Sequence, residues 1–295
     1  MKKFPRFIII IKYLIAALLL WGVFSCLDGA ELYKNIRSIP VSLLISALLA
    51  FNLAQFLCAE RMRYYYARAG RQISWWFNLM LYYVGMFFNI FIPGGFGGDA
   101  YKIHILKKKG EFPVREGIRL QLSIRASGLY SLLLFMALSV FFMPVSADIN
   151  QNLVISGVSG FVLLVSVGYF FSVRWILKES FATAFSVLRF SLPIQGLSLL
   201  CAALLTIGLG QGYYLPEYLF LFIIAAILGM FPVTIGGLGI REMVFLYGAN
   251  YLSWFTGTNV SAEMGVALSL CNLAVTLGSS LLGLLFWERV KQYKF

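Results

Sequence analysis

Long runs of mainly apolar residues constrain this chain more than any other feature. Six such runs occupy Phe7–Leu27, Val41–Cys58, Leu120–Met143, Leu153–Val173, Ser191–Leu209 and Gly265–Trp287. Each is near the roughly 20 residues that a helix needs to cross the apolar core of a bilayer. Only 12% of the 295 residues are charged, whereas a soluble domain carries about 25%. We therefore expect an all-α polytopic membrane protein, with a single integral membrane domain over residues 1–295.

The basic excess and the rarity of histidine exclude several other classes of protein. The net charge of +12 does not require a nucleic-acid partner, because membrane proteins concentrate Lys and Arg in their cytoplasmic loops. The chain has one histidine, and its four cysteines lie in or beside apolar runs without metal-ligand spacing. We expect no nucleic acid, no metal and no cofactor. The first apolar run resembles a signal peptide, but Lys12 interrupts it, and we interpret it as a retained helix.

Charge distribution predicts the orientation of the chain and exposes a discrepancy. The positive-inside rule puts the N-terminus, the basic stretch after Val41–Cys58 and the C-terminus on the cytoplasmic side of a bacterial inner membrane. The densest basic cluster, within residues 102–119, follows the apolar stretch Trp75–Ile92. A full crossing by that stretch would put the cluster outside. The rule is satisfied if residues 73–98 enter from the cytoplasm, turn and return.

The same difficulty recurs in the second half, where residues 218–250 must start and finish outside. The chain then has six full transmembrane helices and two re-entrant hairpins, one from each side. Its halves, 1–145 and 150–289, have the same order of elements in opposite orientation, which is the inverted repeat of many transporters. The alternative is eight transmembrane helices, with residues 99–119 outside against the charge rule.

Both predicted hairpins turn at a glycine cluster next to ionisable residues. Glycine permits left-handed backbone and close approach, and proline ends the preceding helix. A broken helix leaves N–H groups unpaired inside the bilayer, so the break persists only where protein, water or a ligand satisfies them. Free N–H groups at such turns attract phosphate. We expect a lipid- or phosphate-binding site formed by Gly94, Gly95, Gly97, Gly98, Asp99, Lys102, Arg125, Gly236, Gly237, Gly239, Arg241 and Glu242.

Each charged candidate has a functional and a structural interpretation. Arg241 is suited to hold a phosphate through two parallel hydrogen bonds, and Glu242 to orient Arg241 or to carry a proton. Asp99 is expected to pair with Arg125. The structural alternatives are that Asp99 and Lys102 mark a loop at the cytoplasmic surface, and that Arg241 and Glu242 form a pair that only holds the hairpin. Ionisable residues inside membrane segments are costly and are functional candidates by default.

At these glycine motifs the chain resembles the lysylphosphatidylglycerol synthase transmembrane-region family, whose members are flippase-like integral membrane proteins. The stretches that carry the resemblance are FIPGGFGGDAYKIHILKKKG at 91–110, IRASGLYSLLL at 124–134, FPVTIGGLGIRE at 231–242 and LCNLAVTLGSSLLGLLFW at 270–287. Arg61 and Arg63 also fit the basic stretch that follows the second helix in that family. The resemblance covers essentially the whole chain. It implies a membrane domain that handles lipids, and we expect a stand-alone member without an aminoacyl-transfer domain.

The first functional hypothesis is therefore translocation of a phospholipid or polyprenyl-phosphate-linked lipid between leaflets, with no enzymatic activity. The expected partners are membrane lipids with an anionic headgroup. Two alternatives remain open: a membrane enzyme acting on lipid-linked sugars, with Asp99, Glu242 and His104 as its acid–base groups, and an accessory subunit or scaffold for a separate lipid-modifying enzyme. The sequence names neither the lipid nor the oligomeric state.

Overall fold

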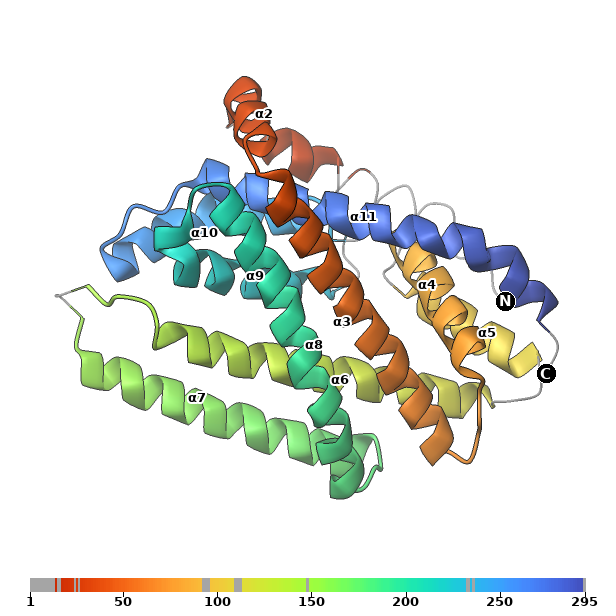
Figure 1. Cartoon of the computed structure of the whole chain (residues 1–295). Helices are drawn as coiled ribbons and strands as arrows, with labels where there is room; N and C mark the ends of the chain where they lie inside the picture. Colours follow the sequence, from red (N-terminus) through yellow and green to blue (C-terminus); the bar gives the residue numbers. More distant parts are fainter. Residues whose placement is uncertain are drawn as a thin grey trace.

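The protein is built from long helices, some of which run across the view of Figure 1 while others cross them obliquely. The computed structural model describes residues 14, 17–23, 25, 27–91, 96–108, 113–146, 149–231, 234 and 237–293. No strand occurs in these residues. The main helices are α2 Gly29–Arg37, α3 Val41–Arg68, α4 Trp75–Phe91, α5 Gly97–Lys108, α6 Val114–Val140, α7 Gln151–Phe171, α8 Phe181–Gly208, α9 Leu215–Gly229, α10 Ile240–Thr256 and α11 Ala262–Gln292. The prediction of an all-helical membrane protein is confirmed.

Six helical segments within the described part of the chain are long and apolar enough to cross a membrane. They span 41–68, 114–140, 151–176, 181–208, 212–229 and 262–292. Five of them are crossings predicted from the sequence. The remaining segment, 212–229, contains α9, which is the first arm of the second predicted hairpin. The predicted first crossing, Phe7–Leu27, falls largely outside the described residues, and so do the predicted turn residues Gly94, Gly95 and Gly236.

Local sequence signals explain where several helices begin. Asp28 caps α2, since its Oδ1 accepts a hydrogen bond of 2.8 Å from the Ala30 N–H. Asn150, Ser180 and Ser261 precede α7, α8 and α11, and their side-chain oxygens accept from backbone N–H groups of the first turn. These caps satisfy donors that a helix start would otherwise leave without a partner.

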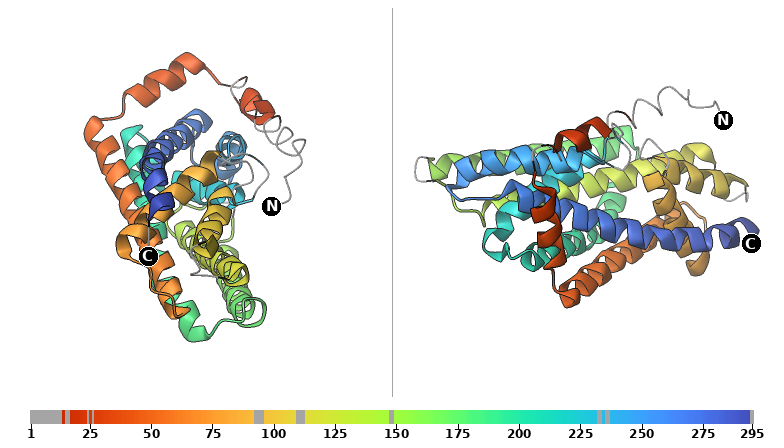
Figure 2. Two further views of the ribbon diagram at one scale, coloured as in Figure 1. Left: turned by 90° about the vertical axis from the view of Figure 1, so that its right-hand side faces the viewer. Right: turned by 90° about the horizontal axis from the view of Figure 1, so that it is seen from above.

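The helix pairs α4–α5 and α9–α10, which form the two predicted hairpins, lie toward opposite ends of the molecule (Figures 1 and 2). The start of α4 lies beside the end of α11, where the Ser74 and Tyr293 hydroxyls are 2.8 Å apart. The start of α9 lies beside the start of α11, where the Tyr218 hydroxyl donates to the Ser261 carbonyl at 2.9 Å. The 12 residues of α5 extend only about 18 Å at 1.5 Å per residue. That length is well short of the apolar core of a bilayer, about 30 Å thick.

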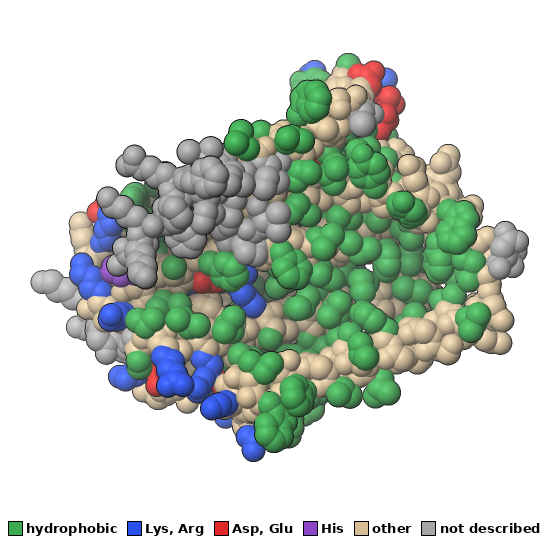
Figure 3. All heavy atoms as spheres, turned by 180° about the vertical axis from the view of Figure 1, so that it is seen from behind, with side chains coloured by type: hydrophobic (Ala, Val, Ile, Leu, Met, Phe, Trp, Pro, Cys, Tyr) green, Lys and Arg blue, Asp and Glu red, His purple; other side chains and the backbone are tan. Residues whose placement is uncertain are grey.

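Charge and apolar surface are separated on the outside of the molecule. In the view of Figure 3, Lys and Arg side chains gather at one end, and hydrophobic side chains cover the broad face beside them. Leu164 on α7, Trp254 on α10 and Leu285 on α11 are each at least 70% exposed. Large exposed apolar side chains on long helices are expected where lipid replaces water as the solvent. The surface therefore agrees with a multi-pass membrane protein.

Candidate functional site

Asp99 holds two cations inside the helical assembly. Arg125 donates to Asp99 Oδ2 from Nη2 at 2.7 Å and from Nε at 3.0 Å, while Lys102 Nζ lies 2.8 Å from Oδ1. Asp99 and Lys102 are 7% and 5% exposed. The expected Asp99–Arg125 pair is thus present, and the alternative that Asp99 and Lys102 mark a surface loop is wrong.

Close packing between α4 and α5 positions this ion-pair group. A Cβ added to Gly98 would overlap the carbonyl group of Gly85, so α5 approaches α4 to a distance that only glycine permits. The Gly98 N–H lies in the first turn of α5, where a helix offers it no backbone acceptor, and it donates instead to Asn89 Oδ1 at 2.8 Å. The stem of Lys102 lies across Gly85. Asp99 and Lys102 are three residues apart, which puts both on one face of the helix.

A hollow of about 160 Å³, here called the ion-pair cavity, adjoins this group. Its polar lining includes Asp99, Lys102, Arg125, Gln121 and Arg61. Arg61 is 6% exposed and donates from Nη1 to Ser191 Oγ at 2.8 Å, but its buried Nε has no partner. Three cationic side chains therefore face one carboxylate, and the cavity has a positive balance.

Arg241 lies near the start of α10, in the second predicted hairpin, where glycines make room for it. A Cβ on Gly229, at the end of α9, would lie 3.0 Å from Arg241 Nε, and a Cβ on Gly237 would lie 3.2 Å from it. Gly237 and Gly239 have φ angles of 78° and 82°, a conformation that side chains disfavour. The backbone at Gly237 and Gly239 therefore bends sharply, and the missing side chains leave space for the guanidinium of Arg241.

Glu242 makes no direct ion pair with Arg241. Glu242 Oε2 accepts from the Gly239 N–H at 2.7 Å, and Oε1 accepts from the Ser269 hydroxyl at 2.8 Å. Glu242 therefore closes the first turn of α10 and ties it to α11. No ion pair involving Arg241 occurs among the described residues, and its buried Nε has no hydrogen-bond partner. The predicted alternative of an Arg241–Glu242 pair is wrong.

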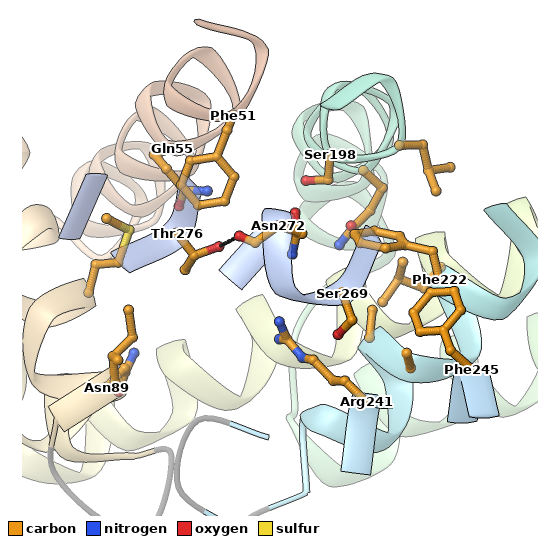
Figure 4. Close-up of a pocket in the computed structure, with 17 residues that line it drawn as sticks. Phe51, Gln55, Asn89, Ser198, Phe222, Arg241, Phe245, Ser269, Asn272 and Thr276 are labelled. Carbon is orange, nitrogen blue, oxygen red and sulfur yellow. Dashed lines mark hydrogen bonds between the residues drawn. The ribbon is translucent and has the colours of Figure 1, made fainter. Parts of the chain in front are cut away.

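Arg241 points into a second hollow, here called the central cavity, with a volume of about 270 Å³ (Figure 4). Residues of α3, α4, α6, α8, α9, α10 and α11 line it. Its polar lining consists of Gln55, Asn89, Gln195, Ser198, Arg241, Ser269, Asn272 and Thr276. Ends of both hairpins therefore border one space, since Asn89 comes from α4 and Arg241 from α10. Asn89 and Met86 also line the ion-pair cavity, so one turn of α4 separates the two hollows.

The structure thus brings together most of the charged residues that the sequence singled out, in two adjacent groups. Asp99, Lys102 and Arg125 form the first group, and Arg241 belongs to the second. Gly97 begins α5 beside them. Arg61, Asn272 and Ser269 are lining residues that the sequence reasoning did not select as site residues. The sequence places Arg61 in a cytoplasmic basic stretch, but α3 continues past it to Arg68 and Arg61 is buried.

The arrangement is suited to binding an anion and offers little for acid–base chemistry. His104 is exposed on α5, Asp99 is held by two cations, and both Glu242 oxygens are occupied. Neither His104 nor Glu242 lines the two cavities. No cluster of three His, Cys, Asp or Glu side chains able to hold a metal ion is found in the described ranges. Cationic and amide groups inside a membrane protein are suited to contacts with anionic or polar ligands.

These features define the class: a polytopic α-helical membrane protein with broken helices and buried cations at its centre. The family model described as "Lysylphosphatidylglycerol synthase TM region" matches residues 9–283, and the chain belongs to that family. The resemblance found in the sequence is thereby confirmed, and with it a role in lipid handling. No curated protein matches the chain.

Proposed function

We propose that the protein translocates a lipid with an anionic, phosphate-containing headgroup between the two leaflets. In this proposal phosphate groups bind at Arg241 in the central cavity and at Lys102 and Arg125 in the ion-pair cavity. The acyl or prenyl chains stay in the surrounding bilayer. A volume of about 270 Å³ in the central cavity is near the lower end of ligand pockets, roughly 300–1,000 Å³. It therefore suits a headgroup better than a whole lipid.

The observation that carries the proposal is a buried arginine that makes no direct ion pair among the described residues and faces a cavity bordered by both hairpins. Burying a cation without a partner costs free energy, and inside a bilayer that cost is expected to be kept only for function. Arg241 faces a cavity rather than a carboxylate, and glycines at 229 and 237 leave the space that it fills. A phosphate accepts two parallel hydrogen bonds from a guanidinium and would supply the direct partner that Arg241 lacks.

Support for alternating access comes from helix pairings that recur between the two halves. Contacts between α3 and α4 have a counterpart between α8 and α9, and those between α4 and α11 have a counterpart between α9 and α6. The pairs α4–α5 and α9–α10, and α5–α6 and α10–α11, follow the same relation. An inverted repeat of this kind would let one half rock against the other around a fixed site. We further propose a bacterial inner-membrane location with both termini in the cytoplasm.

Reconstituted protein tests the proposal. Proteoliposomes would contain a phospholipid that carries a fluorophore on one acyl chain, and a membrane-impermeant quencher would report the fraction accessible outside over time. We expect Arg241→Ala to slow translocation about tenfold or more, since a hydrogen bond to a charged group contributes about 1.5–3 kcal/mol.

Arg63→Ala is the matched control. Arg63 lies on α3, pairs with Glu60 at 2.8 Å and is 45% exposed at the surface, so its removal should leave translocation unchanged. Normal translocation by Arg241→Ala protein, correctly inserted and folded, would contradict the proposal. Translocation by neither variant nor by the unmodified protein would contradict it as well.

A further inference from the structure

We propose that Arg61 and Gln121 complete a phosphate-binding site in the ion-pair cavity. The inference deepens the proposed function and rests on it, because it adds two ligands to the group around Asp99. The bound group is a phosphate, carried either by a lipid headgroup or by free inorganic phosphate. Two buried donors without partners, the charge of the cavity lining and the position of the cavity along α3 support it.

Arg61 has a buried donor that the protein does not use. The side chain is 6% exposed, and its Nη1 donates to the neutral hydroxyl oxygen of Ser191 at 2.8 Å. Its Nε is buried and has no partner among the described residues. A buried donor without a partner costs free energy and calls for an explanation. A phosphate oxygen in the cavity would accept from the guanidinium in a charge-assisted hydrogen bond.

Gln121 lines the same cavity from α6. It is 6% exposed, and its buried Nε2 has no hydrogen-bond partner among the described residues. A leucine of similar size would fill this position without leaving a polar atom unpaired, so packing alone does not account for an amide here. Two helices, α3 and α6, thus each bring a partnerless donor to the lining of one hollow.

The charge of the described lining stays positive when its carboxylate is counted. Asp99 is shared by Lys102 and Arg125, and the three side chains together carry one net positive charge. Arg61 adds a second positive charge to the lining. Glu60, which precedes Arg61 in the chain, pairs with a surface arginine at 2.8 Å and does not line the cavity. An anion that enters the cavity therefore meets an excess of cations.

The ion-pair cavity lies between two larger hollows along one face of α3. Tyr65 lines a hollow of about 270 Å³ near the end of α3, Cys58 and Met62 line the ion-pair cavity, and Gln55 lines the central cavity. These four residues are spaced three or four apart, which puts them on one face of the helix. A phosphate that moves along this face from the end of α3 to Arg241 therefore passes the ion-pair cavity.

Binding to purified protein tests the site separately from the central cavity. Inorganic phosphate and short-chain phosphatidylglycerol would be titrated in detergent into Arg241→Ala protein, whose central cavity lacks its cation, with thermal stabilisation as the readout. We expect at least one of them to bind, and added Arg61→Gln to weaken binding about tenfold or more. Binding of both supports a site for phosphate itself, and binding of the lipid alone supports a headgroup site. Binding of neither, or binding that Arg61→Gln leaves unchanged, overturns the inference.

Gln121→Leu distinguishes a binding role from a structural one, and it keeps the test decisive if Arg61→Gln protein does not fold. The change removes an amide whose Nε2 has no partner, so we expect the melting temperature without ligand to stay equal or to rise. Phosphate or lipid binding should nevertheless weaken about tenfold. Arg63→Gln is the control on the exposed surface of α3, and it should leave binding unchanged. A lower melting temperature with unweakened binding would assign Gln121 a structural role and overturn the inference.

The transport assay separates failure of the inference from failure of the proposed function. Normal binding and translocation by the Arg61→Gln and Gln121→Leu proteins, with translocation lost in Arg241→Ala protein, would overturn the inference and leave the proposed function intact. Phosphate binding that depends on Arg61, without translocation of any lipid by the unmodified protein, would support the inference and overturn the proposed function.

Discussion

Arg241 fills the space that a side chain at Gly229 would need: a Cβ at that glycine would lie 3.0 Å from Arg241 Nε. The last residue of α9 and the second residue of α10 thus fix each other's positions across the hairpin. A methyl group at position 229 would require the guanidinium to move by a few tenths of an ångström. This relationship makes the arginine testable without altering its charge.

Gly229→Ala should therefore displace Arg241 and slow lipid translocation about tenfold. The far end of a flexible side chain yields to a methyl group, so we expect the melting temperature to change little. Gly160→Ala on α7 is the control, since nothing lies within 4 Å of a Cβ there, and its translocation should match that of the unmodified protein. Unaltered translocation by Gly229→Ala protein would show that the position of Arg241 is unimportant.

Asp99→Asn should lower the melting temperature, because it leaves Lys102 and Arg125 without their shared counter-ion. Removing one partner of a buried ion pair costs about 3–5 kcal/mol. Adding Lys102→Met, which retains a stem able to lie on Gly85, should recover part of the loss. Thermal unfolding of the two single variants and the double variant gives the coupling between the residues. Strictly additive effects would mean that the two residues do not interact.

Two glycines of α11 should respond differently to the same substitution. A Cβ on Gly283 would overlap the carbonyl of Tyr83 on α4, whereas nothing lies within 4 Å of a Cβ on Gly278. Gly283→Ala should separate α11 from α4 and reduce the yield of folded protein. Gly278→Ala should express normally and unfold at an equal or higher temperature, since alanine favours helix. Equal yields of the two variants would contradict the close approach of α4 and α11.

Cysteine labelling decides between the hairpin and eight-helix topologies. In a background without the native cysteines, Lys108→Cys and Asn259→Cys would be exposed to an impermeant maleimide on intact spheroplasts; both positions are exposed in the structure. The hairpin topology predicts labelling at 259 and protection at 108. Labelling at both positions would instead support eight crossings. Labelling of 108 after membrane disruption is the control for reactivity.

The long helices are predictable from the sequence, because apolar runs near 20 residues are typical of helices that cross a bilayer. The apolar run Val41–Cys58 predicts too short a helix, since α3 continues through a polar stretch to Arg68. The charges of that stretch suggested a loop. In the fold Arg61 is covered by α8, where Ser191, 130 positions away in the chain, accepts its hydrogen bond. A partner at that distance leaves no local signal.

Part of the site was also predictable from the sequence. Asp99 and Arg125 carry opposite charges at membrane depth, and that combination favours a pair. The partner of Glu242 was not predictable, because Ser269 is one of many serines in apolar helices and most of these hydrogen-bond within their own helix. The adjacent cation Arg241 suggested a pair that the turn geometry does not form.

Met86 and Asn89 line both cavities, and this has a thermodynamic consequence. A ligand that moves either side chain in one cavity changes the shape of the other. If a lipid in the ion-pair cavity alters affinity at Arg241 by some factor, a lipid at Arg241 must alter affinity at Asp99 and its cations by the same factor. Because the two cavities share this turn of α4, headgroups in the central cavity and in the ion-pair cavity would not bind independently of each other.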